Sequence, residues 1–119
     1  MYREFAVPWL RREMSRLDAV EYHLDGPGNV RHLEALCELE DLDVIQWIPG
    51  DGPAAEEDWT WLHDRIDSLG KGQIFWKDSA FAREAWGRYQ SRKLCFVLKA
   101  ATVAEVEDFI AGFEDRRRI

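Results

Sequence analysis

The chain has 119 residues and a mass of 14.0 kDa, which is the size of one compact domain. Apolar residues make up 46% of the chain and charged residues 33%, a composition typical of globular proteins. Its 23 acidic residues outnumber its 16 basic ones, and the resulting net charge of −7 argues against nucleic acids and anionic membrane surfaces as partners.

The spacing of apolar residues predicts alternating helices and strands along the whole chain. A first helix is expected over residues 2–17, kinked or delayed by Pro8. Strands are predicted over 19–24, 42–48, 73–77 and 94–99. A helix is expected after each strand. The first is capped by Asn29, and the second begins after the loop 49–53. The third begins at Asp78 or Ser79, and the fourth at the capping box of Thr102 and Glu105. No tight hairpin signal separates the strands, so we expect them to run parallel through right-handed crossovers.

Four such strand-plus-helix units fit two architectures. One is a small open parallel sheet with helices on both faces, and the other is half of a (β/α)8 barrel preceded by an N-terminal helix. A half barrel leaves two unpaired parallel edges, which a second copy of the chain could cover. In both architectures, ligands are expected at the C-terminal ends of the strands.

The first predicted strand ends in polar side chains. Strand alternation places Glu21, His23 and Asp25 on one face, directly before a Gly-Pro-Gly loop. A histidine and an aspartate two residues apart can aim two ligands at one metal ion or pair an acid with a base. The alternative is that Asp25 caps a helix and His23 packs in the core, and spacing alone favours this alternative because metal sites usually need a third ligand.

The second and third predicted strands end in side chains that could line a ligand pocket. Gln46 is polar within an otherwise apolar strand and could bind a polar group of a ligand. Trp47 and Trp76 could form a pocket wall, or they could pack beneath a helix. Lys77, which follows Trp76, could simply face solvent.

The remaining reactive side chains give weaker signals. Cys37 and Cys95 lie within apolar patterns and are expected to be buried free thiols rather than a disulfide. His32 and His63 lie beside charged residues on predicted helices, as surface histidines do. The chain has no N-terminal signal-peptide pattern and no apolar run long enough to span a bilayer, which predicts a cytoplasmic protein.

Four segments occur in a specific order: Tyr22–Gly28 (Tyr-His-Leu-Asp-Gly-Pro-Gly), His32-Leu33, Leu42–Gly50 (Leu-Asp-Val-Ile-Gln-Trp-Ile-Pro-Gly) and Gly70–Gly72 (Gly-Lys-Gly). Together they resemble the C-terminal half of the uroporphyrinogen decarboxylase-like superfamily, in particular the branch close to corrinoid-dependent methyltransferases. The resemblance runs over residues 2–113. It implies the half (β/α)8 barrel of the two architectures.

The resemblance implies a small acidic, tetrapyrrole or corrinoid-related ligand, and decarboxylase (lyase) or methyltransferase-like chemistry if the protein is an enzyme. The methyltransferase branch binds zinc through a His-x-Cys segment, in which His23 matches the histidine and Asp25 replaces the cysteine. A later cysteine ligand is replaced by Lys99–Ala101. His23 and Asp25 are the expected catalytic or metal-binding pair. The cofactor is left unknown: zinc is the metal of the methyltransferase branch, but the cysteine ligands of that branch are absent here. The residues expected to bind the ligand are Glu21, Gly26, Gln46, Trp47 and Trp76.

Members of this superfamily are about twice as long as this chain, since a complete barrel has eight strands. We therefore expect a homo-oligomer such as a homodimer, or a separate chain that supplies the complementary half of the barrel. The alternative is a truncated relative that acts as a structural or interaction domain without catalysis.

Overall fold

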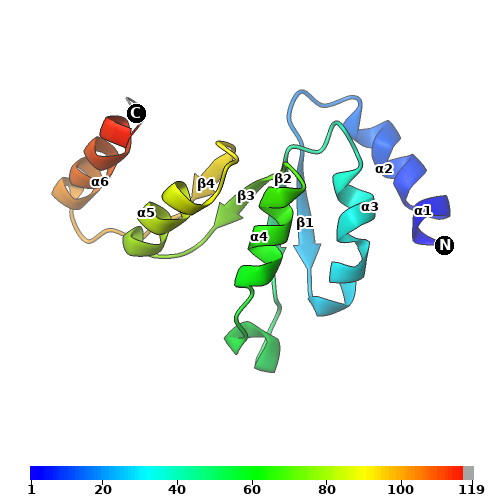
Figure 1. Cartoon of the computed structure of the whole chain (residues 1–119), viewed down its shortest axis with the longest axis horizontal. Helices are drawn as coiled ribbons and strands as arrows, with labels where there is room; N and C mark the ends of the chain where they lie inside the picture. The colour runs from blue at the N-terminus through cyan, green and yellow to red at the C-terminus, as the bar shows by residue number, and fades with distance from the viewer. Residues whose placement is uncertain (117–119) are drawn as a thin grey trace.

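The structure is a computed structural model that describes residues 1–116, so residues 117–119 of the expected domain lie outside the described part (Figure 1). In chain order the elements are α1 (Tyr2–Phe5), α2 (Val7–Met14), β1 (Glu21–Asp25), the 3-10 helix η1 (Pro27–His32), α3 (Leu33–Cys37), β2 (Val44–Ile48), the 3-10 helix η2 (Gly52–Glu56), α4 (Thr60–Ser68), β3 (Gly72–Phe75), α5 (Ser79–Arg88), β4 (Leu94–Phe96) and α6 (Val103–Arg116). No helix within residues 1–116 is long and apolar enough to cross a membrane.

The four strands form one parallel sheet in the order β1-β2-β3-β4. Each new strand is added on the same side of the previous one, so right-handed crossovers place every connecting helix on the same face of the sheet. This order confirms the predicted parallel α/β sheet and is compatible with half of a (β/α)8 barrel. The same strand order excludes the open sheet with helices on both faces, because in such a sheet the order of the strands reverses at one point.

The two faces of the sheet differ in burial. On the helix-covered face, Leu24, Ile45, Trp47 and Phe75 are buried. On the opposite face, the residues that alternate with them are exposed or half-buried except Gly72, as in β1, where Glu21, His23 and Asp25 are all exposed. The period of two along each strand therefore separates a packed face from an open one.

The packed face carries two separate cores. The larger one is mostly aliphatic and joins α1–α4 to β1 and β2 through buried residues such as Leu36, Ile45 and Leu62. The smaller one is aromatic and is centred on Phe75 and Tyr89 below α5. The radius of gyration is 15.9 Å, against about 13.5 Å for a compact domain of this length. Figure 1 shows why: β3, β4, α5 and α6 extend away from the rest, and the two termini lie at opposite ends.

Helix boundaries confirm some predicted caps and correct one. Asp78 caps α5 by accepting a hydrogen bond from the Phe81 N–H at 2.8 Å. In the predicted box before α6, the Glu105 N–H donates to Thr102 Oγ1 at 3.3 Å, while the Glu105 carboxylate accepts from the Ala101 N–H at 2.8 Å. The expected Asn29 cap is wrong. The chain enters a 3-10 helix at Pro27, and the Asn29 side chain instead donates to the Asp25 carbonyl.

The effect of Pro8 is confirmed, because the N-terminal helix divides at Ala6, two residues before the proline. Two further predictions are corrected. The loop 49–53 is expected to hold no helix, yet its last two residues begin η2, because Pro53 suits the first turn of a helix. Both cysteines are free, but neither is fully buried: Cys37 is half-buried, and Cys95 is exposed because it lies on the open face of the sheet.

Candidate ligand-binding site at the ends of β2 and β3

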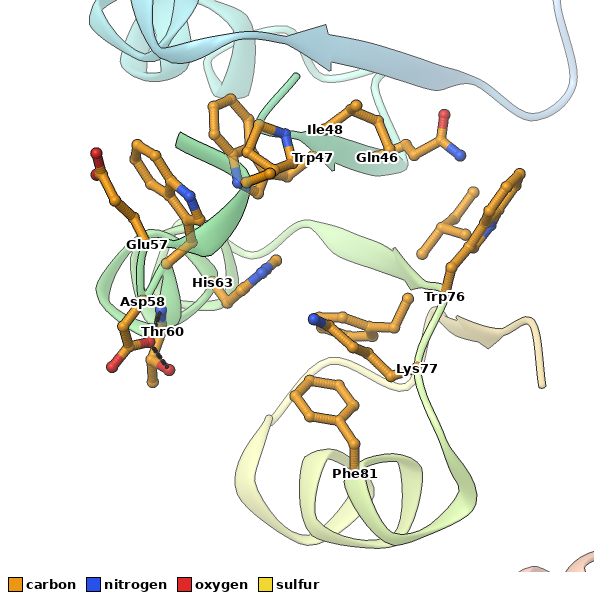
Figure 2. Close-up of a pocket in the computed structure, with 15 residues that line it drawn as sticks. Gln46, Trp47, Ile48, Glu57, Asp58, Thr60, His63, Trp76, Lys77 and Phe81 are labelled. Carbon is orange, nitrogen blue, oxygen red and sulfur yellow. Dashed lines mark hydrogen bonds between the residues drawn. The ribbon is translucent and has the colours of Figure 1, made fainter. Parts of the chain in front are cut away.

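A cleft opens where β2 and β3 separate. Along β1 and β2 five residue pairs are in register, whereas β2 and β3 pair only at Val44↔Gly72 and Ile45↔Gln73. Beyond these pairs the C-terminal ends of the two strands diverge. The cavity between them, of about 260 Å³, is closed by the loop before α4 and by the start of α5 (Figure 2). It lies at the C-terminal ends of parallel strands, where α/β proteins bind ligands.

Aromatic side chains form the walls of the cleft. Trp47 and Trp59 meet edge to face with their ring centroids 4.8 Å apart, and the Trp59 indole N–H donates to the Ala54 carbonyl at 2.8 Å. Phe75 and Phe81 lie 5.0 Å apart on the opposite side. Trp47 was expected to be either a pocket wall or a residue packed beneath a helix, and it is both. It belongs to the large core and also lines the cleft.

One polar atom in this wall has no partner. Trp47 is 6% exposed, and its indole Nε1 is buried without a hydrogen-bond acceptor among the described residues. A buried donor left unpaired costs about 1–3 kcal/mol. An acceptor placed in the cleft beside this N–H would recover that free energy.

His63 reaches from α4 into the cleft in the neutral form. Its Nδ1 lies 2.8 Å from Gln73 Oε1, and the Gln73 amide donates back to the His63 carbonyl at 3.1 Å. The second bond fixes the orientation of the amide, so we assign the imidazole proton to Nδ1 and leave Nε2 as an acceptor. Burial lowers the pKa of His63, and the nearby Lys77 charge lowers it further.

The charged side chains around the cleft point in different directions according to their sign. Figure 2 shows the Lys77 amine pointing into the cavity towards His63, whereas the carboxylates of Glu57 and Asp58 point outwards from the rim. Lys77 makes no hydrogen bond or ion pair with any other described residue. Asp58 is already engaged, because it accepts hydrogen bonds from the Thr60 N–H at 2.9 Å and the Thr60 hydroxyl at 2.6 Å, which lower its pKa. Lys77, an exposed residue, therefore brings one positive charge to the cleft, and the two carboxylates lie at its rim.

The predicted site residues fall into two groups. Gln46, Trp47 and Trp76 all line the cleft, and Trp76 is 66% exposed at its mouth. Glu21, His23 and Asp25 lie together on the open face of β1, outside the cleft. Gly26 follows them with φ +76°, a left-handed conformation that glycine adopts readily, and its N–H extends the β1–β2 ladder to the Ile48 carbonyl at 2.8 Å. The two groups meet at His23, whose Nδ1 lies 2.6 Å from Gln46 Oε1.

The zinc that the resemblance implies does not fit the His23 and Asp25 side chains as they stand. Among residues 1–116 no three His, Cys, Asp or Glu side chains are grouped closely enough to hold a metal ion. One ring nitrogen of His23 is already occupied by Gln46. A structural or catalytic zinc site takes at least three protein ligands, so His23 and Asp25 alone do not form one.

Sequence reasoning missed His63 in the wall of the cleft and Gln73, the buried residue that holds it. His63 was interpreted as a surface histidine, yet it is half-buried in the cavity wall. Its spacing carried the signal, because Trp59, Leu62, His63 and Ile66 fall at the i, i+3, i+4 and i+7 positions of one helix face. Its partner Gln73 is 1% exposed, and only the fold brings it next to His63. His32, the other histidine expected at the surface, is half-buried and stacks on Tyr2.

Comparisons of this chain with protein-family models, with curated proteins and with solved structures find no match.

Proposed function

We propose that the cleft between β2 and β3 binds a small ligand that carries a carboxylate on a flat apolar body. The observation that carries this proposal is the indole N–H of Trp47, which is buried in the wall of the cleft without a partner among the described residues, while the Lys77 amine points into the same cavity. A carboxylate can accept a hydrogen bond from the indole and pair with the ammonium group at the same time.

The shape of the cleft supports a planar ligand. Trp47, Trp76, Phe75 and Phe81 supply ring faces and edges on both sides, and aromatic rings favour stacked or edge-to-face contacts. The volume of about 260 Å³ lies just below the range of about 300–1,000 Å³ that is usual for drug-sized ligands. It suits a benzoate-sized molecule or one carboxylated arm of a larger molecule, rather than a whole tetrapyrrole.

His63 adds a proton acceptor to the site. Gln73 holds its Nδ1–H, so Nε2 is free to accept a hydrogen bond or a proton from a ligand hydroxyl or amine. The pKa of His63 is lowered, so the ring is neutral near pH 7 and keeps this lone pair. An acidic ligand agrees in charge with the expectation from the uroporphyrinogen decarboxylase-like resemblance.

The test is a comparison of a charged probe with a neutral probe of the same shape. Benzoate and benzamide are titrated into the protein, with tryptophan fluorescence and NMR shifts of the indole N–H groups as readouts. We expect benzoate to shift the Trp47 indole resonance and benzamide to bind about tenfold more weakly, because one charge-assisted hydrogen bond contributes about 1.5–3 kcal/mol.

A matched pair of variants identifies the cation responsible. Lys77→Met should abolish the preference for benzoate. Arg16→Met removes one positive charge from an exposed residue that does not line the cleft, and it should leave the preference intact. Equal binding of the two probes by the unmodified protein, or an unchanged preference in Lys77→Met, would contradict the proposal.

A second candidate function, a non-catalytic interaction domain, is favoured by one observation. The open face of the sheet exposes apolar side chains, among them Val97 at 47% exposure. Such a face is typical of a surface that another protein covers. The two functions do not exclude each other, because the cleft and most of the open face are separate surfaces.

A further inference from the structure

The open face of the sheet combines an apolar centre with unpaired edges. Val44, Ile74 and Cys95 line a shallow hollow at its N-terminal end, and Val97 continues this strip along β4. No helix of the described chain covers this face, since all crossovers lie on the other one. Parallel strands with one bare face are rare, because parallel sheets are normally covered on both faces.

The two edge strands carry opposite charges. β1 begins with Glu21 and ends with Asp25, and both side chains are exposed. β4 is preceded by Lys93, which is bound to Asp43 but remains 62% exposed, and it is followed by Lys99, which is also exposed. Neither edge pairs with another strand among residues 1–116. One edge therefore has carboxylates at its ends, and the other has ammonium groups at the corresponding ends.

We propose that the occupant of this face is a second copy of the same chain. A twofold axis parallel to the strands places β4 of each copy beside β1 of the other, parallel and with matching ends. Lys99 of one copy then meets Asp25 of the other at the C-terminal end, and Lys93 approaches Glu21 at the N-terminal end. The two sheets together have eight parallel strands, the number that closes a (β/α)8 barrel with a packed interior.

This arrangement also accounts for the exposed apolar stripe of α6. Val103, Val106 and Ile110 are exposed, at 74%, 43% and 50%. In an unbroken series of strand-helix units, the helix after β4 packs over the groove between β4 and the next strand. With β1 of the second copy in that place, the stripe of α6 gains a surface to cover.

The first measurement is the mass in solution. Light scattering and sedimentation over about 10–200 μM protein should give twice the chain mass of 14.0 kDa. A monomer throughout this range would overturn the proposal.

Charge-swapped variants test which edges pair. Asp25→Lys brings two lysines together at both junctions of the dimer, and Lys99→Glu brings two carboxylates together. Each variant alone should weaken dimerisation about tenfold or more. Mixed in equal amounts they should form a heterodimer of wild-type strength, because both junctions regain opposite charges. Unchanged dimers in both single variants, or no recovery in the mixture, would refute the edge pairing.

A third variant tests the face itself. Val97 is half-exposed in the single chain, so Val97→Lys should leave the monomer folded, as its circular dichroism spectrum would show. The same lysine would be buried inside the eight-stranded barrel and should abolish the dimer. Dimers that persist in Val97→Lys would show that the open face is not the interface.

Discussion

The two ends of the molecule are built from the same strand-helix unit but packed by different side chains. The region of α1–α4, β1 and β2 has a core of aliphatic residues in which Leu36, Ile45 and Leu62 are completely buried. The region of β3, β4, α5 and α6 has only three buried members in its core cluster, and its contacts are between rings such as Phe75, Tyr89 and Phe96. Branched aliphatic side chains fill space on all sides, whereas this thin layer of rings leaves the apolar residues Val103, Val106 and Ile110 of α6 exposed.

The cleft lies at the boundary between these regions. His63 comes from α4 in the first region, while Phe75, Lys77 and Phe81 come from the second. A site at such a boundary responds to movement of one region against the other, and binding sites often lie where the chain is less stable. The region with the larger core therefore positions His63 and Trp47, and the region with the smaller core supplies the cation.

The largest effect should come from the residue where the two regions join. A Cβ added at Gly72 would lie 2.1 Å from the Lys93 carbonyl oxygen and 2.5 Å from the Lys93 Cβ, so β4 could not stay beside β3. Gly72→Ala should lower the free energy of unfolding by more than about 3 kcal/mol, measured by urea denaturation.

The matched control is Gly87→Ala within α5, where an added Cβ meets no atom within 4 Å. This change should be neutral or stabilising by up to about 1 kcal/mol, because alanine favours helix over glycine. If Gly72→Ala changed the free energy of unfolding as little as Gly87→Ala, Gly72 could not lie as close to Lys93 as the structure places it.

A pair of core truncations sharpens the difference between the regions. Leu62→Ala in the aliphatic core should cost about 2–5 kcal/mol and weaken the whole molecule. Phe96→Ala removes a half-buried ring and should cost about 1–2 kcal/mol. Hydrogen exchange should then speed up in β4 and α6 while β1 and β2 stay protected. Equal loss of protection everywhere in Phe96→Ala would mean that the two regions unfold as one unit.

The smallest effect concerns pH and His63. Burial makes the pKa of His63 lower in the folded protein than in the unfolded chain, so the unfolded chain binds more protons in the acidic range. Stability should therefore be full above the unfolded pKa of about 6.5. It should fall as the pH drops below that value, by at most about 1.4 kcal/mol per pH unit for a single proton.

His63→Gln keeps a polar partner for Gln73 but cannot be protonated in this range. Thermal unfolding between about pH 5 and pH 7.5 should show a flatter pH dependence for this variant than for the unmodified chain, since carboxylates titrate mainly below this window. If the two proteins showed the same pH dependence, His63 would be solvent-exposed, which would contradict its burial in the structure.

Part of the fold and of the site can be predicted from the sequence. The alternation of Glu21, His23 and Asp25 with Tyr22 and Leu24 predicted one polar face on β1, because successive side chains of a strand point to opposite sides. Asp78 at the start of α5 was predictable for a local reason as well, since a cap needs only its own first turn. Features that depend only on neighbours within four residues can therefore be predicted from the sequence.

The parts that sequence reasoning missed are those that depend on distant residues. His63 and Gln73 meet only because α4 packs on β3, and a local pattern of charges suggested a surface histidine instead. The apolar pattern around Cys95 predicts a core residue, whereas the strand order places it on the uncovered face of the sheet. Burial of a strand residue depends on what covers each face, and the residues beside it do not encode that.

The sequence alone determined that this chain forms parallel strands linked by helices, because apolar periods of two and 3.6 residues follow from backbone geometry. Tertiary structure decided that the strands follow one another in order, that β2 and β3 separate after Ile45, and that Trp47, His63 and Lys77 surround the gap. Strand order and divergence result from packing between residues far apart in the chain. That packing places the Trp47 indole and the Lys77 ammonium group, neither of which has a hydrogen-bond partner among residues 1–116, beside the same cavity.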